Sequence, residues 1–332
     1  MQRVIVTGGL GFIGSHVADA FLARGDEVVI IDSMVAAVTD GYEYEEHPRC
    51  TVIRKPVEDY LAEGGDFAGY ATVVHAASHV GPAGILKYQG RLGIEIVTTT
   101  QAVIDASLAG DCQLVVFSSA EVYGRSGQLA ETDSIVVPTN YNARLEYAIG
   151  KTLTEAAAIN TRVHGLEAIV VRPFNVAGAR QSSAGGFVMP TFVQQALAGD
   201  PITVFAGGDQ VRAFLAASDL ARFMVENLDD AFAGGDTIFN LGNPGNATTI
   251  WNLAARTKEL VDSSSEIIHA DAEAIHGPLY VEAESFEKLP VLSAAAKVGW
   301  KPRASLDQLI LETAAEYREH GDARVERTAS LS

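Results

Sequence analysis

A glycine-rich segment near the N-terminus constrains the fold of this chain more than any other feature. Residues 7–14 read TGGLGFIG and stand between a short apolar run, Arg3–Thr7, and a stretch of helical periodicity, Gly11–Arg24. The pattern predicts a buried strand that turns tightly into a helix, because glycine adopts backbone angles that are closed to other residues. Bare backbone there would also let an anion approach the positive end of the helix. Glycine turns also join strands to helices for purely structural reasons, so the segment needs context.

The first half of the chain supplies that context by alternating apolar runs with helical patterns. The further runs are Glu27–Asp32, Thr51–Arg54, Thr72–His75 and Leu114–Ser118, and the longer helical stretches are Ile85–Ala109 and Arg144–Val163. Apolar residues follow one another in these runs instead of alternating with polar ones, as in a parallel sheet covered on both faces. We therefore predict an α/β fold with a doubly wound parallel sheet of the Rossmann type.

Beyond about Asn175, the alternation of apolar runs and helical stretches becomes less regular. Loops rich in glycine and proline, such as Ala177–Gly186, are frequent there. We expect residues 1–175 to form the domain that carries the sheet. Residues 176–320 are expected to form a smaller C-terminal lobe, interleaved with the last strands of the first domain, whose loops bind substrate. The polar stretch after Tyr317 should fray, which leaves residues 321–332 as a tail.

Charge and cysteine content exclude several classes of function. The net charge is −18 and the isoelectric point is near 4.8, whereas a nucleic acid or an anionic membrane needs a broad basic surface. Cys50 and Cys112 have no metal-like or CxxC spacing, so we expect no metal site and no disulfide framework. No signal peptide and no apolar run of roughly 18 residues is readable. We expect a cytoplasmic protein.

An acidic residue at the end of the second predicted strand indicates what the glycine turn binds. Asp32 ends that strand, at about the distance from Gly8, Gly11 and Gly14 where dinucleotide folds place a carboxylate on the adenosine ribose. A carboxylate there repels a 2′-phosphate, so NAD is favoured over NADP. The alternative is that Asp32 caps a helix or is a solvated loop acid.

A phenol and an amine four residues apart form the second constellation. Tyr147 and Lys151 lie on one face of the predicted helix, where the cation is expected to lower the tyrosine pKa toward physiological pH. Taken alone, the pair also fits an aromatic ring packed under the stem of a lysine. The fifth strand, however, delivers the hydroxyls of Ser118 and Ser119 to the carboxyl edge of the sheet, where open α/β folds bind ligands.

Seven motifs together resemble the extended short-chain dehydrogenase/reductase family, in its nucleotide-sugar epimerase and dehydratase branch. They are TGGLGFIG at Thr7–Gly14, Asp32, HAA at His75–Ala77, SSAEVYG at Ser118–Gly124, YAIGK at Tyr147–Lys151, RPFN at Arg172–Asn175 and QVRAF at Gln210–Phe214. The resemblance implies NAD as cofactor, a nucleotide-diphosphate sugar as substrate and a role in carbohydrate metabolism. It also implies a homodimer that pairs through the helices expected at Ile85–Ala109 and Arg144–Val163.

The resemblance also implies a role for individual residues. Tyr147 is similar to the family's catalytic base, Lys151 to the residue that holds the nicotinamide ribose, and Ser119 to the group that bonds the reacting sugar oxygen. The implied cofactor-binding residues are Gly8, Gly11, Phe12, Ile13, Gly14, Asp32, Ser33, Val57, Ala76, Ala77, Ser118, Tyr147, Lys151 and Phe174. The implied substrate-binding residues are His79, Ser119, Asn175, Arg212 and Lys288.

The chain departs from the family pattern at several positions. The Asn-x-x-Gly-Thr of many relatives is missing from Ile94–Thr100, and Pro56 precedes Val57 where relatives place an aspartate beside the adenine. Lys288 stands where relatives often have an arginine for the second phosphate, and a lysine lacks the bidentate fork.

Two titratable residues, Glu121 and His75, have a structural and a functional interpretation. Relatives that dehydrate or decarboxylate the keto sugar often have an acid at the position of Glu121, although one dehydratase type has Asp-Glu where this chain has Ala120 and Glu121. The alternative is that Glu121 caps a turn or pairs locally. His75 ends an apolar strand and is expected to be a hydrogen-bonded structural group, and a functional role is the alternative.

Taken together, these features predict an NAD-dependent nucleotide-sugar epimerase that works through a transient 4-keto sugar. The alternatives are a dehydratase or decarboxylase that uses Glu121, and a net oxidoreductase that releases NADH. A scaffold without turnover is disfavoured because Ser119, Tyr147 and Lys151 are all present.

Overall fold

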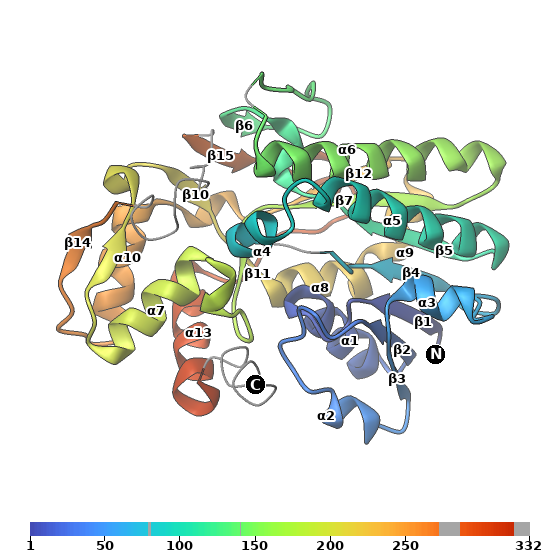
Figure 1. The fold of residues 1–332 in the computed structure, drawn as a ribbon, viewed down its shortest axis with the longest axis horizontal. Coiled ribbons are helices and arrows are strands. Elements are labelled where there is room, and N and C mark those ends of the chain that lie inside the picture. The colour runs from blue at the N-terminus through green and yellow to red at the C-terminus, as the bar shows by residue number, and fades with distance from the viewer. Residues whose placement is uncertain (79–80, 140, 272–285, 322–332) are drawn as a thin grey trace.

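A sheet of seven parallel strands forms the centre of the molecule (Figure 1). The computed structural model describes residues 1–78, 81–139, 141–271 and 286–321. The strand order is β12-β7-β5-β4-β1-β2-β3. The strands are β1 (Arg3–Thr7), β2 (Glu27–Asp32), β3 (Cys50–Arg54), β4 (Thr72–His75), β5 (Gln113–Phe117), β7 (Ala168–Pro173) and β12 (Ile238–Leu241). The order runs outward in both directions from β1, so the predicted doubly wound α/β fold is confirmed.

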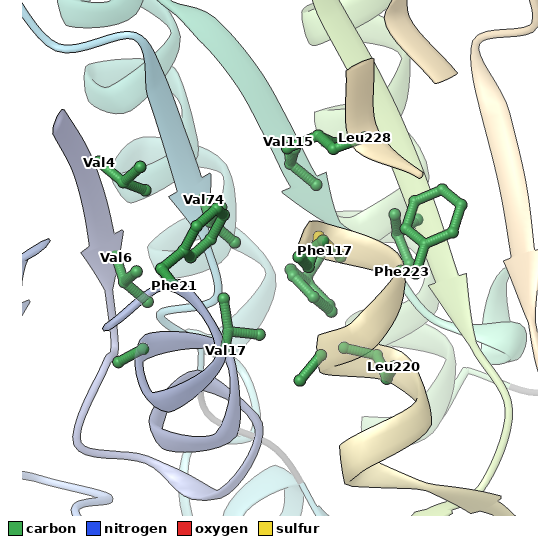
Figure 2. Packing of buried hydrophobic residues seen from close by; sticks show 14 of the residues in the cluster. Val4, Val6, Val17, Phe21, Val74, Val115, Phe117, Leu220, Phe223 and Leu228 are labelled. Atoms are coloured by element: carbon green, nitrogen blue, oxygen red, sulfur yellow. The ribbon is translucent and has the colours of Figure 1, made fainter. Parts of the chain in front are cut away.

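Helices cover both faces of this sheet and bury its apolar side chains. One face packs against α1 (Phe12–Arg24), α8 (Ala217–Glu226), α9 (Leu228–Ala233) and α12 (Ser293–Lys297), and the other against α3 (Val57–Ala62), α5 (Leu92–Ala109) and α6 (Ala143–Thr161). Strand β1 shows the principle, since Val4 and Val6 point to the first face and Ile5 to the second. Figure 2 shows Val4 and Val6 beside Phe21 of α1.

A smaller body with a core of its own follows in the sequence. Its helices are α7 (Val188–Ala198), α10 (Ile250–Leu260) and α13 (Leu306–His320). Three short sheets accompany them: β13 (Ala247–Thr249), β10 (Val211–Ala213), β15 (Glu287–Pro290) and β6 (Gly127–Leu129) in the first, β11 (Leu215–Ala216) with β8 (Val176–Ala177) in the second, and β14 (Ile267–His269) with β9 (Ile202–Val204) in the third. Because α8, α9 and β12 return to the central sheet, the two parts are interleaved in the sequence.

The remaining elements are short helices at the edge of the sheet and in loops. They are the α-helices α2 (Tyr42–Glu45) and α4 (Gly81–Lys87) and the 3₁₀ helices Ala120–Tyr123, Arg162–His164, Ser183–Gly185, Ala206–Gly208 and Pro244–Asn246.

The helix expected over Ile85–Ala109 is wrong, because two helices, α4 and α5, occupy this stretch. Gly90 lies between them with φ at 81°, a left-handed conformation that no continuous helix contains. The Glu146 carboxylate of α6 accepts hydrogen bonds from the backbone N–H groups of Gly90 at 2.6 Å and Gly93 at 3.0 Å. A side chain from a distant helix therefore caps the start of α5, which no local pattern reveals.

The C-terminal helix also extends further than expected. We predicted fraying after Tyr317, but α13 continues to His320. A capping box at Ser305 and Gln308 starts the helix, and the Tyr317 hydroxyl donates to the Gln181 carbonyl at 3.1 Å, which anchors its last turns. Of the predicted tail 321–332, all but Gly321 lies outside the described residues. In the part of the chain that the structure describes, no helix is long and apolar enough to cross a membrane.

Candidate active site

A cavity of about 1110 Å³ runs along the carboxyl edge of the central sheet and continues between that sheet and the smaller body. Nearly all residues predicted from the sequence line it. They are Gly8, Gly11, Phe12, Ile13, Gly14, Asp32, Ser33, Val57, Ala76, Ala77, Ser118, Ser119, Glu121, Tyr147, Lys151, Asn175, Arg212 and Lys288. These residues come from seven helices and strands and from the loops between them, so segments spread over most of the chain meet at one place.

The glycine turn forms one end of the cavity and is too tight for other residues. Gly8 has φ at 71°, and a Cβ added there would lie 2.7 Å from the Ala77 backbone. A Cβ on Gly14 would lie 2.1 Å from the Gly8 carbonyl oxygen. Gly11 is the N-cap of α1 and has no side-chain oxygen to satisfy the first N–H groups of the helix. Those donors and the helix dipole fit the pyrophosphate of a dinucleotide.

Asp32 at the end of β2 is held in a fixed position beside this turn. Its Oδ2 accepts from the Leu10 N–H at 2.9 Å and its Oδ1 from the Met34 N–H at 2.7 Å. Burial raises the pKa of this carboxyl, while the backbone donors act in the opposite direction. A carboxylate can accept about four hydrogen bonds, so Asp32, with backbone donors at Leu10, Gly11 and Met34, can still accept from a hydroxyl of an adenosine ribose. The residues present therefore fit NAD.

Ser119, Tyr147 and Lys151 line the same cavity at a distance from the glycine turn. Ser119 follows β5 and caps a 3₁₀ helix, and its side chain is hydrogen-bonded to the Tyr147 hydroxyl. The Lys151 ammonium donates to the Phe117 carbonyl at 2.9 Å and lies 5.9 Å from the centre of the Tyr147 ring. The predicted grouping of a serine, a phenol and an amine is thus present in the structure.

The expected effect of Lys151 on Tyr147 is not found in the protein without ligands. Burial raises the pKa of Tyr147, and Lys151 is bonded to a carbonyl instead of the phenol. Burial also lowers the pKa of Lys151 to about 8, partly offset by Glu155. The apolar surroundings disfavour either charge, so Tyr147 is neutral at neutral pH, whereas Lys151 keeps its proton there but loses it more readily than a free lysine does. A phenolate at Tyr147 therefore needs a further positive charge nearby, which a ligand could bring.

His75 has the structural role that we expected. It is 2% exposed, and its ring nitrogens are hydrogen-bonded to the hydroxyls of Thr7 at 2.7 Å and Thr100 at 3.1 Å. Burial lowers its pKa to about 3, so the ring is neutral. The histidine therefore joins β1, β4 and α5 and does not act as a switch near neutral pH.

Glu121 lies in a cluster of cations that lines the same cavity as Tyr147. Its Oε1 accepts from the Lys288 ammonium at 2.6 Å and lies 3.9 Å from a guanidinium nitrogen of Arg144. Burial by itself raises the pKa of Glu121, but Lys288, Arg144 and Arg212 outweigh it and lower the pKa to about 2. The carboxylate is therefore ionised at neutral pH and holds Lys288, which we had assigned to a phosphate.

The other predicted substrate and cofactor residues differ in how the structure places them. Asn175 has φ at 41° and donates from its side chain to the Ala213 carbonyl at 3.2 Å, and Arg212 donates to the Val211 carbonyl at 2.8 Å.

Phe174 was expected beside the nicotinamide, but its ring is fully buried against Tyr123, with 6.1 Å between the ring centres. Neighbouring Pro173 lines the cavity instead. His79 lies outside the described residues.

Sequence reasoning missed several polar residues that line the same cavity, among them Arg144 and Gln181. Arg144 precedes Tyr147 by three residues, so the helical spacing used for Lys151 could have found it. Gln181 stands in a loop without a motif, and nothing local points to it. Among the described residues, no three His, Cys, Asp or Glu side chains are grouped so that they could hold a metal ion.

Comparisons with known proteins agree with this geometry. The sequence profile described as "NAD dependent epimerase/dehydratase family" matches residues 4–242. The UDP-N-acetyl-alpha-D-glucosaminuronate decarboxylase of Bacillus cytotoxicus is 29% identical, covering 96% of this chain and 98% of that protein. The UDP-glucuronic acid decarboxylase 6 of Arabidopsis thaliana is 31% identical, covering 92% of this chain and 85% of that protein.

Solved structures share the fold at lower sequence identity. The UDP-N-acetylglucosamine 4-epimerase of Methanobrevibacter ruminantium superposes with a TM-score of 0.82 at 23% identity, covering 96% of this chain and 98% of the other. The UDP-glucuronic acid 4-epimerase of Bacillus cereus, in complex with UDP-glucuronic acid and NAD, gives 0.79 at 21% identity, with 96% and 99% covered. The chain belongs to the NAD-dependent epimerase/dehydratase family.

Proposed function

We propose that this enzyme uses NAD to oxidise the C4 hydroxyl of a nucleotide-diphosphate sugar to a transient ketone. The observation that carries the proposal is the hydrogen bond between Ser119 and the Tyr147 hydroxyl, with Lys151 on the same helix face. The glycine turn and Asp32 line the same cavity. A cofactor that spans from the turn to Tyr147 therefore brings its reactive ring to the hydroxyl pair.

Each of these side chains has a role in the oxidation. Tyr147 first loses its phenol proton to solvent, and the phenolate then accepts the proton of the sugar hydroxyl. Ser119 donates a hydrogen bond to that oxygen as negative charge develops there. NAD, when bound, would accept the hydride from C4, and its positive charge would favour the phenolate. Lys151, at 5.9 Å from the phenol ring, stabilises the phenolate once it is charged.

Epimerisation remains our first candidate for the rest of the cycle. The ketone is reduced again from the opposite face of the sugar, Tyr147 returns its proton to the oxygen, and NAD is regenerated. This reaction needs room for the sugar to turn, and a cavity of about 1110 Å³ exceeds the usual range of roughly 300–1,000 Å³ for small-molecule sites. A net oxidoreductase would instead accumulate NADH.

The cluster around Glu121 favours decarboxylation as a second candidate. Three cations, Lys288, Arg144 and Arg212, face one carboxylate, so the cluster has excess positive charge that suits a sugar with a carboxylate at C6. After oxidation at C4, the C5–C6 bond of such a sugar can break, with its electron pair moving onto the C4 oxygen and carbon dioxide leaving. Dehydration fits less well, because an ionised Glu121 has no proton for a leaving hydroxyl.

A product analysis separates the candidates. We suggest incubating the enzyme with NAD and either UDP-glucose or UDP-glucuronic acid, and reading products by mass spectrometry and NMR. Unchanged mass with inverted C4 supports epimerisation, loss of carbon dioxide supports decarboxylation, and loss of water supports dehydration. A stoichiometric rise in NADH absorbance identifies the net oxidoreductase. No reaction with a wider panel of GDP-, dTDP- and CDP-sugars would contradict the proposal.

The Lys288→Met variant tests whether the cation cluster binds the C6 carboxylate of the sugar. We expect its KM for UDP-glucuronic acid to rise about tenfold, because a charged hydrogen bond of roughly 1.5 kcal/mol is lost. For UDP-glucose the KM should change less than twofold. Lys297→Met, at an exposed lysine paired with Asp236, is the matched control and should leave both values unchanged. Equal losses for both sugars would remove Lys288 from carboxylate recognition.

A further inference from the structure

A buried network of four polar side chains, Glu155, Arg172, Tyr123 and Asn240, connects elements that carry the site. Arg172 of β7 and Glu155 of α6 are 2% and 4% exposed and form a bidentate ion pair, with distances of 2.8 Å and 2.6 Å. The guanidinium carbon of Arg172 lies 4.8 Å from the centre of the Tyr123 ring. The Tyr123 hydroxyl donates to Oδ1 of Asn240 in β12 at 2.7 Å, and both residues are fully buried.

Both halves of the catalytic group belong to elements that the buried network joins. Lys151 precedes Glu155 by four residues on α6, so the two side chains share a face of the helix that also carries Tyr147. Tyr123 ends a short 3₁₀ helix, and Ser119 is the N-cap of that helix. The network therefore connects the segment that begins at Ser119 with the helix that carries Tyr147.

The amide of Asn240 holds the far end of the network in one orientation. Its Nδ2 donates to the Leu129 carbonyl at 2.9 Å and to the Val291 carbonyl at 3.0 Å. Exchanging the nitrogen and the oxygen would place Oδ1 against two carbonyl oxygens, neither of which can donate. Oδ1 therefore has to face the Tyr123 hydroxyl, and this hydroxyl acts as the donor.

Stability alone explains the buried network poorly. Charges lose their hydration when they are buried, and apolar residues of similar volume often replace a buried ion pair without loss of stability. Hydrogen bonds between buried groups differ from apolar contacts because they fix a direction as well as a distance. The described lining of the cavity contains none of the four side chains, so contact with a ligand does not explain them either.

We infer that the buried network is a positioning device that sets the distance between Ser119 and Tyr147, and with it the place of the sugar oxygen between their hydroxyls. The four residues act through this pair and touch neither sugar nor cofactor. A displacement of about 1 Å between reacting groups can lower a rate by about 100-fold. The inference rests on the sugar oxidation proposed above, but the rigidity that it assigns to residues 119–124 is measurable without any sugar.

Tyr123→Phe removes the hydroxyl at the centre of the network without changing a charge. Turnover is measured with UDP-glucose and with UDP-glucuronic acid, and the dissociation constant of NAD by displacement of fluorescent NADH. We expect kcat to fall at least about tenfold, whereas KM and the dissociation constant should change less than about twofold, because the residues that line the cavity are unaltered.

Tyr44→Phe is the matched control. Tyr44 is 5% exposed, and its hydroxyl donates to Asp19 at 2.7 Å, outside the network. The variant loses a comparable buried hydrogen bond, so its denaturation midpoint should fall as in Tyr123→Phe while its kcat stays at the wild-type value.

Replacing both members of the ion pair separates positioning from stability. The double variant Glu155→Met with Arg172→Met leaves neither charge unpaired, so its denaturation midpoint should stay close to that of the wild type. We expect its kcat to fall at least about tenfold as well. Hydrogen exchange of the protein without ligands measures the rigidity directly. The amides of residues 119–124 should exchange faster in both network variants, and those of α13 should exchange as in the wild type.

A wild-type kcat in Tyr123→Phe, measured where this variant is folded, would overturn the inference even if the double variant did not fold. Unchanged exchange of residues 119–124 would overturn it too. If only the double variant is slow, the charge of Glu155 and not the network explains the loss, which also contradicts the inference. A wild-type protein that converts no nucleotide sugar would contradict the proposed function, and the exchange rates would then decide the inference by themselves.

Discussion

Burial controls the ionisation of Tyr147 and Lys151 more strongly than their mutual spacing does. Both side chains are at most 5% exposed, and the apolar surroundings hold the phenol and the amine toward their neutral forms. At the scale of single residues, the phenol of Tyr147 is therefore protonated at neutral pH, and only a change in the surrounding charge, such as a ligand brings, would favour the phenolate.

Removing the phenol hydroxyl tests Tyr147 as the base. Tyr147→Phe should lower kcat by at least about 100-fold, because general-base catalysis contributes roughly 10²- to 10⁴-fold. The dissociation constant for NAD should change little, since the glycine turn and Asp32 are untouched. Steady-state kinetics and NADH displacement check the two quantities. Turnover at the wild-type rate would exclude Tyr147 as the base.

The lowered pKa of Lys151 predicts a pH dependence of stability. Between pH 8, its folded value, and pH 10.5, its ordinary value, the unfolded chain binds a proton that the folded chain has lost. Lys151 therefore contributes a free energy of unfolding that increases as the pH rises through this window. Denaturant titrations of the wild-type protein and Lys151→Met at pH 8 and pH 10 measure the difference. A difference between the two proteins that does not change with pH would contradict the buried, lowered pKa.

At the scale of elements, the turn from β1 to α1 contains a glycine, Gly14, that the helix disfavours but that the close packing of the turn requires. Gly14 lies inside α1, and a glycine inside a helix costs up to about 1 kcal/mol relative to alanine. The close approach of the Gly8 carbonyl outweighs that preference, since a Cβ on Gly14 would lie 2.1 Å from its oxygen. The glycine is therefore required by the turn and not by the helix.

This balance makes opposite predictions for two glycines in helices. Gly14→Ala should destabilise the protein by about 1–3 kcal/mol, because the turn has to open, and should weaken NAD binding with it. Among the described residues, no atom lies within 4 Å of a Cβ added to Gly84 in α4, so Gly84→Ala should leave stability unchanged or raise it by up to about 1 kcal/mol. Denaturation midpoints and NADH displacement provide the test. A stabilising Gly14→Ala would refute the steric account of the turn.

At the scale of the whole molecule, α5 and α6 pack side by side and leave apolar side chains uncovered. Ile149 and Leu153, four residues apart on α6, are 42% and 52% exposed. In Figure 1 the two helices run along one side of the molecule. Exposed apolar groups at helical spacing are typical of an interface, so we expect the homodimer predicted from the sequence to form here.

A charge on that face tests the dimer. Leu153→Glu should raise the dimer dissociation constant at least about tenfold, because the interface would have to bury an unpaired carboxylate. Light scattering after gel filtration, over a range of concentrations, gives the mass. Leu311→Glu, at a 42% exposed leucine of α13, is the control and should leave the mass unchanged. A wild-type protein that is monomeric at high concentration would contradict the expectation.

The sequence by itself determined the parallel sheet, the glycine turn and the pairing of Tyr147 with Lys151 on one helix face, and the family resemblance implied that Ser119 joins them. These depend on short-range patterns: buried strands have continuous apolar runs, tight turns need glycine, and residues four apart share a helix face. Each such pattern is written in neighbouring positions of the chain. The fold class and most of the cavity-lining residues could therefore be predicted before any coordinates.

Only the tertiary structure decided the interactions between distant segments. Lys288 meets Glu121 across 167 positions of sequence, Glu146 interrupts the expected helix by capping α5, and Gln181 reaches the cavity from a loop without a motif. The ring of Phe174 packs against Tyr123 instead of facing the cavity. Such pairings, and the pKa shifts that follow from burial, depend on which surfaces pack together, and packing is a property of the whole folded chain.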